Sequence, residues 1–319
     1  APGLAQAHNN LGVVLQALRR HAEAISHHER SLAIQPGNAE ALNNLGNALR
    51  ALDRHQEALA RFEAALAVNP DHAEIHVNAG SAYLALDRPA AALPAFDAAL
   101  AIKPDYAEAL YNRGIALQAL KREPEAVAPY EAALAIRPDY AEAHNNLGNV
   151  FLELGQLEAA GVHYDKALAL KPDFPEALAN RGTVLRGLGR IEEACLAFAR
   201  AAELAPRKTR TYLDLVDCKR LLPDDPHLAA MEALARDTAL DDEARVYLGF
   251  ALGKAYEDLG RHEESFRALA TANALKRRTM DYDEAATTGE LERIAAAFTP
   301  ALLQRPQSRD GGSPLPIFI

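Results

Sequence analysis

Asparagine recurs at one position of a 34-residue period along the chain. The residues are Asn10, Asn44, Asn78, Asn112, Asn146 and Asn180, and Asn47 and Asn149 add two further amides. Inside a helix asparagine costs up to about 0.7 kcal/mol relative to alanine, so a regular series needs a compensating interaction. A primary amide donates and accepts hydrogen bonds, as the backbone of an extended peptide does. The series therefore predicts a peptide-binding strip, with hydrogen bonding between neighbouring repeats as the alternative.

Other residue types that carry chemistry show no comparable pattern. His72 and His76 lie four residues apart, a spacing that can bind metal on a helix, but no third ligand accompanies them. The two cysteines, Cys195 and Cys218, match no zinc or redox motif. We find no nucleophile elbow and no phosphate-binding loop. We therefore expect no catalytic residue, no metal and no cofactor in this fragment.

The elements that position the amides follow from an internal repeat. Prolines recur every 34 residues, at Pro2, Pro36, Pro70, Pro104, Pro138, Pro172 and Pro206. Glycines keep the same step, at Gly12, Gly46, Gly80, Gly114, Gly148 and Gly182. A fixed period of this length is typical of stacked helical repeats. Six copies occupy residues 1–206, and the phase of Pro2 predicts that the array begins upstream of residue 1.

Each copy resembles the tetratricopeptide repeat, a helix–turn–helix unit of 34 residues. Repeat two shows the motif as Leu45-Gly46, Ala58, Phe62, Ala65 and Pro70. The family's first-helix tryptophan is absent, because the chain contains none. The resemblance implies an all-α fold, a right-handed superhelix (an α-solenoid), in which the first helix of each repeat lines a concave groove. The array also resembles the O-GlcNAc transferase arm, where such an asparagine series holds protein substrates.

An aspartate follows most repeat prolines, and a glutamate lies three residues after it. The pairs are Asp71 and Glu74, Asp105 and Glu108, Asp139 and Glu142, and Asp173 and Glu176. Aspartate is favoured at a helix N-cap, and a glutamate three residues later can complete a capping box. We expect these carboxylates to cap helices rather than to act as a catalytic acid and base.

Beyond Pro206 the period fails. Residues 208–222 and 226–239 predict two helices, residues 246–279 form a degenerate seventh repeat, and a last helix is expected at about 283–298. We assign 207–298 to a helical extension that caps the solenoid, since terminal repeats shield an otherwise exposed apolar end. Residues 299–316 are rich in proline, glycine and serine and are expected to form a linker.

The chain ends in the short apolar run Ile317, Phe318 and Ile319. Such a run is typical of a buried strand, so we interpret 317–319 as the stub of a missing α/β domain. Repeats, this extension and a strand like PIFI together resemble bacterial tetratricopeptide-repeat sulfotransferases. The resemblance implies that the parent enzyme uses 3′-phosphoadenosine 5′-phosphosulfate, bound in the missing domain, and that this fragment recruits the substrate. The alternatives are a stand-alone scaffold or adaptor and the arm of an O-GlcNAc-type glycosyltransferase.

Charge and hydropathy restrict the classes of partner that the protein is expected to bind. The net charge is −10, and an acidic chain repels phosphate backbones, so nucleic acid is not expected. No apolar run is long enough to cross a membrane, which predicts no membrane partner and a cytoplasmic location. The expected partner is a protein or peptide in the concave groove.

Overall fold

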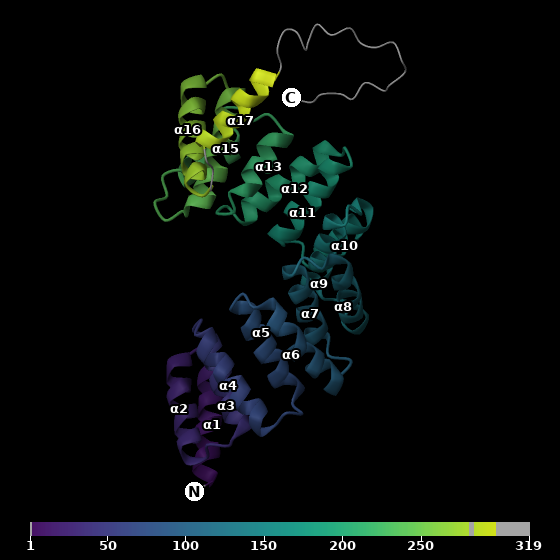
Figure 1. The fold of residues 1–319 in the computed structure, drawn as a ribbon, viewed down its shortest axis with the longest axis vertical. Coiled ribbons are helices and arrows are strands. Elements are labelled where there is room, and N and C mark those ends of the chain that lie inside the picture. The colour runs from purple at the N-terminus through teal and green to yellow at the C-terminus, as the bar shows by residue number, and fades with distance from the viewer. Residues whose placement is uncertain (1, 281–283, 298–319) are drawn as a thin grey trace.

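The computed structural model describes residues 2–280 and 284–297, where helices are the only regular elements (Figure 1). Six antiparallel pairs follow the 34-residue period: α1 (Pro2–Ala17) with α2 (His21–Ile34), α3 (Ala39–Arg50) with α4 (His55–Val68), α5 (Ala73–Ala85) with α6 (Pro89–Ile102), α7 (Ala107–Ala119) with α8 (Glu123–Ile136), α9 (Ala141–Glu153) with α10 (Leu157–Leu170), and α11 (Pro175–Gly187) with α12 (Ile191–Leu204). The linker and the strand stub predicted at 299–319 lie outside the described residues.

The extension comprises α13 (Arg210–Cys218), α14 (Pro226–Leu234), α15 (Asp242–Asp258), α16 (His262–Arg278) and α17 (Glu284–Ala297). α15 and α16 form the helix pair over the stretch interpreted as a seventh repeat. α13 and α14 end earlier than 222 and 239. Lys219 is already extended, at φ −139° and ψ 149°, and in the turn after α14 the Asp237 side chain accepts the Ala239 N–H. None of the helices described is both long and apolar enough to span a membrane.

A glycine and an aromatic ring join the two helices of each regular repeat. The Phe62 ring on α4 lies so close to Gly46 on α3 that an added Cβ would be 2.5 Å from it. The same contact recurs between Gly80 and Phe96, Gly114 and Tyr130, Gly148 and Tyr164, and Gly182 and Phe198. In the first repeat the imidazole of His28 takes the place of the ring, against Gly12. The glycine period therefore marks the closest approach within each pair.

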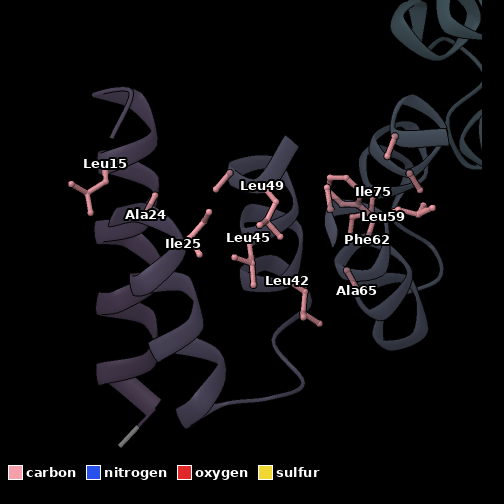
Figure 2. Close-up of a cluster of buried hydrophobic side chains, with 14 residues drawn as sticks. Leu15, Ala24, Ile25, Leu42, Leu45, Leu49, Leu59, Phe62, Ala65 and Ile75 are labelled. Carbon is pink, nitrogen blue, oxygen red and sulfur yellow. The ribbon is translucent and has the colours of Figure 1, made fainter. Parts of the chain in front are cut away.

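The buried apolar side chains form a series of clusters along the array, and the first cluster joins the first three repeats. Figure 2 shows this cluster, in which Leu15 and Ile25 of repeat one belong together with Leu42 and Leu45 of repeat two. The same cluster continues through Leu59 and Phe62 to Ile75 of repeat three. Each repeat thus buries its apolar side chains against its neighbours, which is how a solenoid is stabilised without one central core.

The predicted capping boxes are wrong. α5 begins after His72 and α7 after Tyr106, so Asp71 and Asp105 lie one residue too early, and these helix starts have no side-chain cap. The same holds for α9 and α11, which begin after Tyr140 and Phe174. Each of the three aromatic residues instead packs under a cation three residues earlier: Lys103 over Tyr106 (4.7 Å), Arg137 over Tyr140 (3.3 Å) and Lys171 over Phe174 (4.5 Å). α5 begins at the same repeat position with Asn69 in place of the cation, so this packing accompanies the helix start and does not determine it.

The regular array is curved, with the odd-numbered helices on its inner side. Each of α1 to α11 with an odd number contacts the next odd-numbered helix. The even-numbered helices of successive repeats make no contact of similar extent within the described range. Helices that approach one another lie at the smaller radius, so α1, α3, α5, α7, α9 and α11 line the concave surface. Figure 1 shows the resulting arc from α1 to the cap.

Candidate peptide-binding groove

The asparagine series lies on the concave helices. Asn10 is on α1, Asn44 and Asn47 on α3, Asn78 on α5, Asn112 on α7, Asn146 and Asn149 on α9, and Asn180 on α11. Asn10 is exposed, Asn78 is buried, and the others are half-buried. The helical period thus places all eight side chains on one set of helices, as a groove would require.

From the second repeat onward, each amide of the main series donates a hydrogen bond to the preceding repeat. The bonds are Asn44 to Asn9 (3.2 Å), Asn78 to Asn43 (2.9 Å), Asn112 to Ser81 (3.5 Å), Asn146 to Tyr111 (3.1 Å) and Asn180 to Asn145 (3.1 Å). Asn10 accepts from Gln6 on its own helix, and Asn47 accepts from Arg50. Bonding between repeats, the alternative considered for the series, is therefore one of its roles.

Two of the three amides nearest the cap, Asn149 and Asn180, keep unused hydrogen-bonding capacity. Asn149 Oδ1 accepts from Tyr164 (2.8 Å) and Asn180 (2.8 Å), but its amide nitrogen has no acceptor among the described residues. Asn180 uses its nitrogen for Asn145 and Asn149, and within the same part of the chain nothing donates to its oxygen. The Asn146 nitrogen donates to the Tyr111 hydroxyl (3.1 Å) and is also hydrogen-bonded to the Tyr130 hydroxyl. Together the unused groups of Asn149 and Asn180 present donors and an acceptor, the complement of a peptide unit.

These three amides share a cavity of about 590 Å³, which we call the amide cavity. One side is formed by Asn145, Asn146 and Asn149 of α9 and by Glu176, Ala179 and Asn180 at α11. The other side is formed by the 207–211 segment and by Asp241, Glu243, Ala244 and Tyr247 at α15. The cavity therefore brings together three of the predicted site residues, and the five others lie along the same surface outside it.

Charged groups of the extension complete this cavity. Lys208 forms an ion pair with Glu176, and Arg210 donates to the Tyr247 hydroxyl (3.2 Å) and lies over the Tyr247 ring (5.2 Å). Partial burial disfavours ionisation of Glu176, but the hydrogen bond from Lys208, a backbone hydrogen bond and the charges of Lys208 and Lys171 together outweigh it. The pKa of that carboxyl is therefore lowered. The cavity thus combines uncharged amides on one side with cations already paired to acidic or aromatic partners on the other.

The two histidines at helical spacing, His72 and His76, do not form a pair. His76 contacts the Pro70 carbonyl oxygen through Nε2 (2.7 Å), and no hydrogen bond joins it to His72. Two other histidines, His144 and His163, face one another across α9 and α10 (3.1 Å between the Nδ1 atoms). Burial, together with His144 and Lys166 nearby, lowers the pKa of His163 to about 4. Over the described residues, no group of three or more His, Cys, Asp or Glu side chains is placed to hold a metal.

The sequence did not reveal the hydrogen-bond partners of the amides. These partners lie 35 or 31 residues away, so they come together only when repeats stack. The segment at 207–210, Arg-Lys-Thr-Arg, is recognisable in the sequence as a basic run that could contact a partner, and the structure adds that it lines the amide cavity. Its position just after the last repeat proline was the available signal.

Comparison with known families decides the class of protein. Tetratricopeptide-repeat models match residues 3–71, 43–107 and 175–208, and a TPR-repeat model matches 122–155 and 148–189. The chain belongs to the tetratricopeptide-repeat family. Together with the helix pairs, this confirms the predicted all-α tetratricopeptide solenoid. As a tetratricopeptide protein, the chain is a repeat scaffold for protein interaction.

Solved structures share this tetratricopeptide fold. PilW, a widely conserved type IV pilus biogenesis factor, is 25% identical with a TM-score of 0.58 and covers 63% of this chain and 94% of PilW. PilF of Pseudomonas aeruginosa is 22% identical with a TM-score of 0.56 and covers 62% of this chain and 90% of PilF. Among curated proteins, an uncharacterised protein of Aquifex aeolicus (strain VF5) is 28% identical over 95 residues, which are 30% of this chain and 12% of that protein.

Proposed function

We propose that the concave surface binds an extended polypeptide segment and that its asparagine amides contact the peptide backbone. The observation that carries the proposal is the unused donor and acceptor capacity of Asn149 and Asn180 inside the amide cavity. An extended segment carries an unpaired N–H and C=O at every residue, and fixed amides can bind both. The net charge of −10 favours a segment that carries basic residues.

A single substitution separates the binding role of Asn149 from its structural role. Asn149→Asp keeps the side-chain oxygen that accepts from Tyr164 and Asn180 but removes the free amide donors. A random peptide library is selected on the full chain, and the affinity of the best peptide is measured by fluorescence anisotropy. One lost hydrogen bond of about 1 kcal/mol weakens binding roughly fivefold.

The matched control is Asn69→Asp, at the exposed residue that ends α4. It adds the same negative charge away from the amide cavity and is expected to change the affinity less than about twofold. If Asn149→Asp binds the selected peptide no more weakly than Asn69→Asp, the amide does not contact the peptide and the proposal is wrong.

We also propose that this scaffold is the substrate-recruiting arm of a cytoplasmic sulfotransferase. The support is the resemblance of the repeats, the extension and the PIFI run to that family. The donor 3′-phosphoadenosine 5′-phosphosulfate would bind outside residues 1–316, and the fragment itself would supply no catalytic residue. Reading the parent gene beyond the codon for Ile319 tests this: a glycine-rich loop with arginine, serine and threonine supports the enzyme, whereas a stop codon or a glycosyltransferase domain contradicts it.

A further inference from the structure

Two histidine pairs occupy equivalent positions in repeats one and five. His8 on α1 faces His27 on α2, and His144 on α9 faces His163 on α10. In both pairs the two Nδ1 atoms are 3.1 Å apart. The ring centroids are 5.3 and 5.4 Å apart, and the ring planes are tilted by 34° and 36°. The same geometry thus arises twice, four repeats apart.

The backbone orients one ring of the second pair. His144 Nε2 lies 3.3 Å from the carbonyl oxygen of Pro138 and can bond to it only as a donor. In the neutral ring this leaves the Nδ1 lone pair of His144 pointing at His163. A metal-ligating histidine is typically fixed in this way, with its other ring nitrogen donating to a carbonyl oxygen. His163 is further held by stacking on Phe151, at 5.4 Å between centroids.

We propose that each pair chelates one divalent transition-metal ion through its two Nδ1 atoms. Nitrogen atoms 3.1 Å apart can share an ion at the usual distance of ~2.0–2.1 Å with an N–metal–N angle of roughly 100°, within the range of tetrahedral and octahedral sites. The ion takes the place of the proton between the rings, and that proton moves to Nε2 of His163, or of its counterpart in the first pair, so both rings stay neutral.

The surroundings of the second pair leave room for further ligands. His144 and His163 line a cavity of about 610 Å³ formed by α8, α9 and α10, which Glu131 and Lys166 also line. Water can fill the remaining coordination positions, while the Lys166 ammonium opposes the ion. Two imidazole ligands favour nickel, copper or zinc over calcium or magnesium, which prefer oxygen ligands. Asn149 and Asn180 do not line this cavity, so a result that contradicts metal binding leaves the peptide proposal unaffected, and the reverse also holds.

The chain contains its own matched control. His76 holds the position of His144 in repeat three and makes the same carbonyl contact with Pro70, at 2.7 Å. Its partner position is Ala95. His76 therefore shares the orienting bond but lacks a second imidazole, and we expect it to bind no ion tightly.

The test is calorimetric titration of the untagged full chain with Ni²⁺ at neutral pH. We expect two ions per chain, one in His163→Ala, none in the double variant His27→Ala, His163→Ala, and two in His76→Ala. Far-UV circular dichroism checks that each variant is folded, and His144→Ala provides a second way to remove the same site. The proposal is overturned if folded His163→Ala and His144→Ala still bind two ions per chain. It is also overturned if His76→Ala loses one bound ion, as His163→Ala is expected to do.

Copper binding gives a second readout that a structural role would not change. In His27→Ala loaded with one equivalent of Cu²⁺, the electron paramagnetic resonance spectrum should show coupling to two nitrogen atoms. Coupling that is unaltered by the further change His163→Ala contradicts a chelate at this pair.

Discussion

At the scale of single residues, the primary amide explains how one side chain can serve both fold and binding. The oxygen of Asn149 is occupied by Tyr164 and Asn180, and its nitrogen is free of partners over the described part of the chain. Asn180 has the opposite arrangement, with its nitrogen bonded and its oxygen available. An aspartate would lose the donors and a serine would not reach both partners, so asparagine fits the position chemically.

The imidazole of His28 makes the first repeat sensitive to acid. Burial, followed by the nearby His27, lowers the pKa of His28 to about 4, against about 6.5 in an unfolded chain. Protons therefore bind the unfolded state more tightly. The stabilising contribution is fully present above pH 6.5 and is lost as the pH falls toward 4. Between pH 7 and 5 we expect the free energy of opening of α1 and α2 to fall by on the order of 1–2 kcal/mol.

Hydrogen exchange of α1 and α2 amides at pH 7 and 5, corrected for intrinsic rates, measures this loss. His28→Phe should remove most of it, since phenylalanine is uncharged and fills the slot that Phe62 occupies in repeat two. His76→Phe is the control and should leave the acid loss in place. Equal acid loss in His28→Phe and the natural chain would show that another group is responsible.

Replacing glycine by alanine should have opposite effects on stability at Gly80, which belongs to the glycine period, and at Gly161, which does not. A Cβ at Gly80 would lie 2.5 Å from the Phe96 ring, so Gly80→Ala should cost about 1–3 kcal/mol of unfolding free energy through overpacking. Gly161 lies inside α10 with its nearest such contact at 3.5 Å, so Gly161→Ala should gain up to about 1 kcal/mol. Urea unfolding compares the two variants, and a destabilised Gly161→Ala would contradict this account.

At the scale of elements, the turn inside each repeat has one backbone geometry and several residue types. The turn residue is left-handed in repeats one to four, with φ of 60° at Arg19, 58° at Asp53, 54° at Asp87 and 57° at Lys121. Glycine takes the same position in the next two repeats and in α15–α16, at Gly155, Gly189 and Gly260. The first four repeats therefore bear a conformational cost that the later ones avoid.

Placing glycine at a turn position that holds another residue, and the reverse exchange, should change the free energy of unfolding in opposite directions. Lys121→Gly relieves the left-handed strain and should stabilise the protein by a few tenths to about 1 kcal/mol, less the added flexibility of the unfolded chain. Gly155→Ala introduces the strain and should destabilise it by about 1 kcal/mol. Thermal unfolding of both variants against the natural chain is the measurement. A loss of stability in Lys121→Gly would show that the lysine compensates in another way.

The sequence predicted those features that depend on the period and missed those that depend on packing across it. Prolines and glycines at one step were enough for the helix pairs, and the concave position of the asparagines was implied by the resemblance to the tetratricopeptide repeat. The capping boxes failed because the N-cap positions lie one residue after the aspartates, and the residues there have side chains that form no cap, namely His72, Tyr106, Tyr140 and Phe174. The pairing of His144 with His163, nineteen residues later, follows no helical spacing and appears only when α9 and α10 pack.

At the scale of the whole molecule, the amide cavity lies where the regular array meets its cap. α9 and α11 supply the asparagines, while the 207–211 segment and α15 supply cations, carboxylates and Tyr247. Elsewhere the concave surface repeats the same amide at each step, which suits an extended segment of any sequence. The non-repeating side chains at this junction are the ones that can select a partner, so the cap is expected to set specificity.

Site-specific photo-crosslinking to the selected peptide tests the central claim most directly. A photoreactive amino acid replaces Glu243, which is exposed and lines the amide cavity, or Leu196, which is 72% exposed on α12, a convex helix. Binding in the groove predicts a cross-link from position 243 and none from position 196. A peptide that cross-links from 196 and not from 243 would place the binding surface on the outer helices and contradict the account.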